Sequence, residues 1–100
     1  MISSYQIVSW RDIPAQVKAR SGRTRTGKEL SERFQVFIDR AAMRAGLFNT
    51  DDYLAEWRTS DPQEREGEPE AVAAAVAAEL EAAYPDSRLE TLALNGGHEA

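Results

Sequence analysis

The sequence contains no cysteine and a single histidine, His98, close to its end. Without cysteine the chain has no disulfide framework, no thiolate nucleophile and no sulfur ligands for a zinc finger. A lone histidine near a chain end rarely acts as a catalytic base or metal ligand. We therefore expect no metal, no cofactor and no Ser-His chemistry, and we expect that the chain is not an enzyme by itself.

Long apolar runs are also missing. No run approaches the ~20 residues that cross a bilayer. Residues 1–10, MISSYQIVSW, lack the charged lead and long apolar segment of a signal peptide. We therefore expect a cytoplasmic protein without membrane contact.

The 100 residues that are present, 42% hydrophobic and 29% charged, have the composition of one folded domain with a modest core. Their net charge of −5 is unevenly distributed. Residues 1–46 hold nine Lys and Arg against four Asp and Glu, whereas residues 47–100 hold three against thirteen. Either the two halves face each other and partly neutralise, or they form two surfaces that meet different partners.

Residues 28–45 are predicted to form one long amphipathic helix around which the domain is organised. Its apolar side chains recur at a helical period, as Leu30, Phe34, Phe37, Ile38, Ala41 and Ala45. Gly46 follows as a left-handed stop, and Leu47 is placed to fold back on the last turn.

The N-terminal segment is predicted to be a β-hairpin that packs on this helix. Residues 5–10 and 15–20 alternate in polarity, and residues 11–14, RDIP, have the chemistry of a turn. Trp10 is expected to cover Phe34 and Phe37. The alternative role for Trp10 is that of an aromatic contact for a ligand.

The second half is predicted to be mainly helical. Thr50 or Asn49 caps a short helix with Tyr53, Leu54 and Trp57 on its apolar face, and residues 68–84 form an alanine-rich helix. Residues 58–67 are an edge strand or a loop because they contain Pro62. Residues 88–94 fit a final strand or a short helix, and we favour the strand.

These elements predict one α+β domain over residues 1–94, followed by a disordered tail at residues 95–100. A small antiparallel sheet, made of the hairpin and one or two further strands, packs against two main helices and one short helix.

Basic residues concentrate around residues 21–27, which are predicted to be a polar loop. Lys18, Arg20, Arg23, Arg25 and Lys28 are five cations in eleven positions. Gly22 to Lys28 also fits the phosphate-loop pattern G-x-x-x-x-G-K. Glu29 follows, however, where magnesium needs Ser or Thr, so we do not predict nucleotide hydrolysis. The segment binds an anion, remains a solvated loop, or contacts the acidic half of the chain.

Two polar residues of the long helix are further candidates. Asp39 lies beside the apolar stripe, where it either has a functional role or forms a salt bridge with Arg40, Arg20 or Arg23. Arg33 is expected to anchor the hairpin turn through Asp12.

Several segments resemble the bacterial conserved virulence factor domain family, most specifically WRDIPAQV at residues 10–17. The others are YQIV at 5–8, LSERFQ at 30–35, ID at 38–39, AAM at 41–43 and Trp57. The resemblance covers about residues 4–85, and the chain is similar to stand-alone members, without helical repeats. It transfers no catalytic residue. It implies an accessory role, with one-carbon and methyl-transfer enzymes as associated systems.

The sequence thus predicts a protein-interaction or accessory module that binds a protein partner. Its expected surface joins the turn at residues 11–14 to the basic segment 20–28, with Arg11, Arg20, Arg23, Arg25 and Lys28 as candidate contacts. One alternative is a small anion- or RNA-binding module in which Trp10 stacks on a base. Another is an enzyme subunit whose active site another chain completes, with Arg33 and Asp39 contributing.

Overall fold

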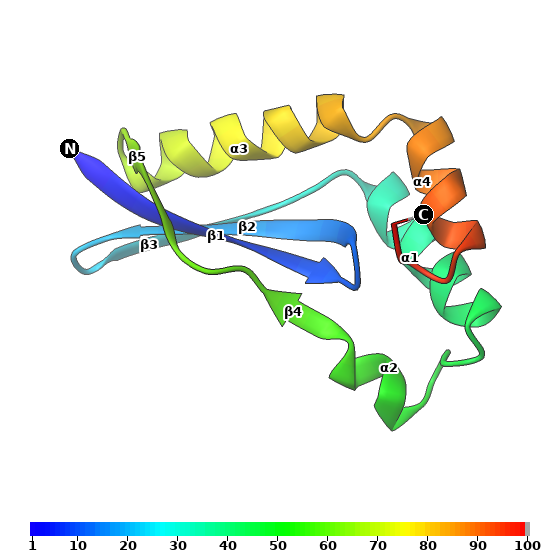
Figure 1. Cartoon of the computed structure of the whole chain (residues 1–100). Helices are drawn as coiled ribbons and strands as arrows, with labels where there is room; N and C mark the ends of the chain where they lie inside the picture. The colour runs from blue at the N-terminus through cyan, green and yellow to red at the C-terminus, as the bar shows by residue number, and fades with distance from the viewer. Residues whose placement is uncertain (100) are drawn as a thin grey trace.

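The computed structural model describes residues 1–99, which form a five-stranded antiparallel sheet and four helices (Figure 1). The strands are β1 (Ile2–Trp10), β2 (Ile13–Ser21), β3 (Thr24–Glu29), β4 (Trp57–Thr59) and β5 (Gln63–Glu66). The helices are α1 (Glu32–Arg44), α2 (Asp51–Ala55), α3 (Pro69–Ala83) and α4 (Asp86–Leu94). The predicted α+β class is confirmed.

The sheet is organised around β1, which pairs with β2 on one edge and with β4 and β5 on the other. The segment predicted as an edge strand or loop therefore supplies two short strands. Ser60 lies in the break between these two strands and stays bound to β1. Its backbone N–H donates to the Ile7 carbonyl, and its hydroxyl oxygen accepts a hydrogen bond from the Ile7 N–H. Pro62 also lies in this break, where no ladder hydrogen bond is required of it.

The basic segment is a strand rather than the predicted polar loop. β2 continues to Ser21, Gly22 and Arg23 make a tight turn, and β3 runs back antiparallel along β2. Gly22 supplies the turn with a φ of +59°, which glycine adopts without strain. The two threonines of TRTGKE favour a strand, and the prediction of a loop gave this preference too little weight.

The long helix was predicted correctly except at its start. α1 begins at Glu32, because Lys28 and Glu29 still belong to β3 and Leu30 donates its N–H to the Ala15 carbonyl. Its end follows the prediction, since Gly46 has a φ of +74° and the Leu47 N–H reaches back to the Ala42 carbonyl at 2.8 Å. This is the hydrogen-bond pattern of a Schellman motif.

α3 covers one face of the sheet (Figure 1). It packs on β2 and β3 through a buried stripe that includes Val72 and Val76, with Ala73 and Ala77 beside them. The small alanines allow helix and sheet to approach closely. α3 thereby covers the face of the sheet that carries Val17 and Ala19, whereas α1 borders the opposite face at its Val8 end.

Residues 86–94 form helix α4, so the predicted final strand is wrong. In a segment this short, alternation and helical spacing both fit the apolar residues. Leu89, Leu92 and Ala93 are spaced i, i+3, i+4 and are all buried, and the helix packs against α1. Contact with α1 therefore decided the structure of this segment.

Residues 95–99, predicted as part of a disordered tail, lie against the turn between β1 and β2. The Asp12 N–H donates to the Gly97 carbonyl at 2.8 Å, and the Glu99 N–H donates to an Asp12 carboxylate oxygen at 2.8 Å. Gly97 has no room for a side chain, because a Cβ would lie 2.8 Å from the Trp10 ring. Ala100 lies outside the described residues.

Candidate functional site

The two faces of the sheet differ in exposure and charge. Along β2, Val17 and Ala19 are buried towards α3, whereas Lys18 and Arg20 alternate with them and are exposed. We call the side away from α3 the open sheet face. By register and by the lining of its groove it carries Ser4, Gln6, Val8, Gln16, Lys18, Arg20, Arg25 and Gly27.

Three cations gather at one end of the open sheet face. Arg20 pairs directly with Arg25 across β2 and β3, and Lys18 lies in the next row opposite Gly27. They line a groove of about 540 Å³, which we call the cationic groove. Side chains directly opposite each other in a sheet lie roughly 5 Å apart at Cβ, and like charges there are destabilising. The arrangement therefore lowers stability unless an anion lies between the cations.

Other arginines of the chain have carboxylate partners. Arg11 pairs with Glu56, Arg33 with Glu81 and Asp86, so the basic and acidic halves do neutralise each other at these points. In contrast, within residues 1–99, Lys18, Arg20 and Arg25 form no ion pair; the same holds for Arg23, Lys28, Arg40 and Arg44. The positive charge of the cationic groove is thus not neutralised by an ion pair within the described residues.

The predicted basic cluster is divided between the two faces. Lys28 pairs with the buried Val17, so it projects on the α3 side of β3, away from Arg25. Arg23 occupies the turn at the end of the hairpin. Lys18, which the sequence grouped with these cations but did not select as a contact, belongs to the groove instead.

A second hollow of about 480 Å³ lies at the other end of the open sheet face. Val8, Leu30, Phe34 and Trp57 give it apolar walls, and we call it the apolar hollow. Glu29, Glu32 and Gln35 stand around it, and Gln16 lines both this hollow and the cationic groove. Sequence reasoning missed Trp57 here because it placed this residue on the short helix, whereas it begins β4 opposite Trp10.

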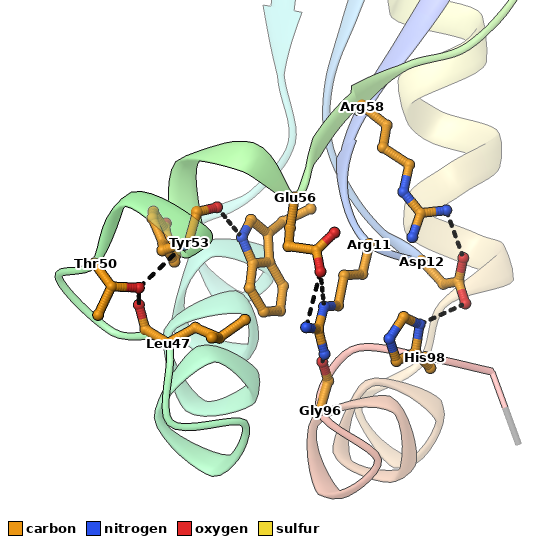
Figure 2. Close-up of polar contacts among 10 residues, drawn as sticks. Arg11, Asp12, Leu47, Thr50, Tyr53, Glu56, Arg58, Gly96 and His98 are labelled. Carbon is orange, nitrogen blue, oxygen red and sulfur yellow. Dashed lines mark hydrogen bonds and ion pairs between the residues drawn. The ribbon is translucent and has the colours of Figure 1, made fainter.

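Arg11 is part of the fold rather than of an open surface. Its side chain is 13% exposed, its Nε and Nη2 donate to the Glu56 carboxylate, and its Nη1 donates to the Gly96 carbonyl at 2.9 Å (Figure 2). Its φ of +51° shows that these contacts hold a strained backbone. Three of the five N–H donors of the Arg11 guanidinium are thus engaged within the domain, so this side chain stabilises the turn between β1 and β2.

Trp10 is fully buried in the core, as the packing prediction required. Its Nε1 donates to the Tyr53 carbonyl at 2.9 Å, and its ring stacks on Tyr53 with centroids 5.5 Å apart. A base or ligand cannot reach this ring, so the alternative role as an aromatic contact is wrong.

The predicted surface does not exist as one patch. The turn at residues 11–12 and the turn at residues 22–23 lie at opposite ends of β2. At about 3.3 Å per residue, the nine-residue β2 holds them roughly 30 Å apart. A partner that contacts both turns must span the length of β2.

Arg33 and Asp39 also differ from expectation. Arg33 binds the corner between α3 and α4 through Glu81, Asp86 and the Tyr84 carbonyl, and not Asp12. Asp39 accepts a hydrogen bond from Gln35 at 2.9 Å, and the expected salt bridge to Arg40, Arg20 or Arg23 is absent from residues 1–99.

Two kinds of feature are absent from the described part of the chain. No helix in residues 1–99 combines the length and the hydropathy needed to cross a bilayer. No group of three or more His, Asp or Glu side chains in these residues is arranged to hold a metal ion.

The fold is that of an α+β domain in which α3 packs on one face of a five-stranded antiparallel sheet. A family model described as "Virulence factor" matches residues 8–93. The chain therefore belongs to the virulence factor family, as the resemblance indicated. Neither curated proteins nor solved structures provide a match. The family match indicates no molecular function.

Proposed function

We propose that this domain is a non-enzymatic, cytoplasmic interaction module that binds an acidic segment of a partner protein in the cationic groove. The observation that carries the proposal is the direct pairing of Arg20 with Arg25, beside Lys18, with no carboxylate of residues 1–99 in ion-pair range. An anionic partner would neutralise this repulsion and gain charge-assisted hydrogen bonds.

A protein partner suits the charge pattern better than RNA does. The residues lining the cationic groove include no aromatic ring on which a base could stack. Glu64 lies one strand from the groove, opposite Ser4, and Glu29 and Glu32 stand at the other end of the open sheet face. A continuous phosphate backbone would meet these carboxylates, whereas a short acidic segment can avoid them.

The test is a titration with a fluorescently labelled Ser/Gly peptide that carries a central run of four glutamates as the probe. The double variant Arg20→Glu/Arg25→Glu should bind at least tenfold more weakly than the parent protein. Binding to the parent should also weaken steeply with added salt, because the contacts are exposed charges.

The matched control is Arg40→Glu/Arg44→Glu, which makes the same charge change on α1, away from the open sheet face. Binding close to that of the parent is expected for this control, with circular dichroism verifying that both variants are folded. Equal losses in the two double variants would reduce the effect to net charge and overturn the proposal. Tighter binding of a ten-uridine RNA than of the peptide would overturn the choice of a protein partner.

A further inference from the structure

The two ends of the open sheet face, taken along the strands, differ in charge and hydrophobicity. Its cationic groove lies at the Ser4 end of β1, and its apolar hollow lies at the Val8 end. The two share Gln16 as a lining residue, so they are parts of one continuous surface. A partner segment that lies along the strands would contact both.

The apolar hollow has the form of an anchor site. Four of its lining side chains are apolar and at least partly buried: Leu30 and Phe34 are nearly fully buried, and Val8 and Trp57 are half-buried. Burying a large apolar side chain contributes about 1.5–3 kcal/mol. A single anchor of this kind is typical of the residues that dominate binding energy.

We propose that the partner segment is recognised at two points, an apolar side chain in the apolar hollow and an acidic side chain between Arg20 and Arg25. This inference rests on the proposed function. The proposed function involves only the cationic groove, and this inference adds the apolar hollow to the site of the same partner.

The sheet register sets the distance between the two points. Val8 pairs with Gln16 and Ser4 pairs with Arg20, so the two rows are four residues apart on β1. At about 3.3 Å per residue this is about 13 Å. In an extended segment, side chains four residues apart project to the same side and span this distance. The recognised pattern is therefore an apolar residue and an acidic residue with three residues between them.

Two glutamates beside the apolar hollow determine which way round the partner segment lies on the open sheet face. Glu29 and Glu32 at the apolar hollow would repel a carboxylate placed there. Reversing the segment would put its acidic residue beside these glutamates and its apolar residue among three cations. Only one direction therefore satisfies both points.

Binding is tested with nine-residue Ser/Gly peptides as probes. The first carries phenylalanine at its third position and glutamate at its seventh and eighth. The second has phenylalanine at its sixth position, next to the same glutamates, and the third has serine in place of phenylalanine. The first should bind at least tenfold more tightly than the other two.

The two indole N–H signals in a nitrogen–proton correlation spectrum show where the peptide binds. The Trp57 signal should shift with the first peptide, whereas the signal of the fully buried Trp10 should stay. In Val8→Thr, which keeps the shape of the side chain but makes it polar, affinity for the first peptide should fall while affinity for the third is unchanged. The Trp57 signal is measured on the parent protein, so this test does not depend on whether a variant folds.

The outcomes separate the two proposals. Equal binding of all three peptides, each lost in Arg20→Glu/Arg25→Glu, would overturn two-point recognition and leave the acidic-partner function standing. Binding that survives Arg20→Glu/Arg25→Glu would overturn the function itself. A Trp57 signal that does not move in the bound state would remove the hollow from the site.

Discussion

Glu81 of α3 caps the start of α1 through Ser31. One of its carboxylate oxygens accepts the Ser31 N–H at 2.6 Å and the other accepts the Ser31 hydroxyl at 2.8 Å. Ser31 occupies the N-cap position, yet its own side chain caps no backbone N–H of α1. The cap is therefore supplied from 50 residues further along the chain, and it ties α1 to α3.

This cap predicts a pH-dependent contribution to stability. Partial burial acts to raise the pKa of Glu81, but the hydrogen bonds from Ser31 and Arg33 outweigh it and hold the pKa below its ordinary value of 4.5. Ionised Glu81 thus stabilises the fold above pH 4.5, and the contribution is lost as the pH falls through the lower pKa of the folded state. Glu81→Gln should lower the free energy of unfolding at pH 7 by about 1 kcal/mol.

Urea unfolding between pH 3 and pH 7 measures both effects, and Glu79→Gln is the control. Glu79 pairs with Arg65 on the surface, so its removal should have a smaller effect at pH 7. A Glu81→Gln protein with the stability of the parent at neutral pH would show that the cap does not stabilise α1.

Gly97→Ala is expected to destabilise the domain strongly. The new Cβ would lie 2.8 Å from Cζ3 of Trp10, and the backbone φ of +94° is unfavourable for alanine. Overpacking of this kind costs about 1–3 kcal/mol. Thermal unfolding should show the loss.

Gly22→Ala separates backbone strain from the clash with Trp10. Gly22 has a φ of +59° but no atom within 4 Å of the added Cβ. Its loss should be limited to the roughly 1 kcal/mol of left-handed strain. Equal losses at the two glycines would show that the contact with Trp10 contributes nothing.

Arg11→Lys should destabilise although it keeps the charge. A lysine cannot reach the Glu56 carboxylate and the Gly96 carbonyl together, as the Arg11 guanidinium does. The loss of hydrogen bonds to a charged, mostly buried group is about 1.5–3 kcal/mol. Urea unfolding measures it.

Arg58→Lys is the comparison for Arg11→Lys, because Arg58 is exposed and its Nη1 lies 3.9 Å from the Asp12 carboxylate. Its effect should be under about 0.5 kcal/mol. If Arg11→Lys proves equally mild, the guanidinium does not hold the C-terminal segment in place.

Arg25→Thr should leave the domain as stable as the parent or slightly more stable. It removes the like-charge pair with Arg20, which is worth a few tenths of a kcal/mol in a sheet. Lys28→Thr is the control on the same strand. It also replaces a cation by threonine, but the residue opposite Lys28 is Val17 and not a second cation. The stability of Arg25→Thr should exceed that of Lys28→Thr in urea unfolding, and the reverse order would remove the argument that the cationic groove is unfavourable without a partner.

The sequence was informative where local signals decide the structure. The period of α1, the stop at Gly46 and the cap at Thr50 depend on neighbours in the chain, and all were predicted. The structure of residues 86–94 depends on α1, and the start of α1 depends on the pairing of β3 with β2 and on the contact of Ser31 with Glu81, so neither could be derived from nearby residues.

In the candidate site, too, local sequence determines some features and contacts between distant segments determine others. Counting cations located the segment that holds Arg20 and Arg25, but the pairing of β2 with β3 determines which cations share a face. That pairing moved Lys28 to the other side and brought Lys18 in. The apolar hollow was out of reach for the sequence, because Trp57 reaches it only through the pairing of β4 with β1.

The central position of β1 determines the order in which the domain can fold during synthesis. The hairpins of β1, β2 and β3 need only local contacts and can form once residue 29 has emerged from the ribosome. The other edge of β1 remains unpaired until residues 57–66 follow, and the Val17 side of the sheet remains uncovered until α3 is made. Until residues 57–66 have been made the nascent chain thus presents an open strand edge, and until α3 is complete at Ala83 it presents an apolar sheet surface; both features favour aggregation.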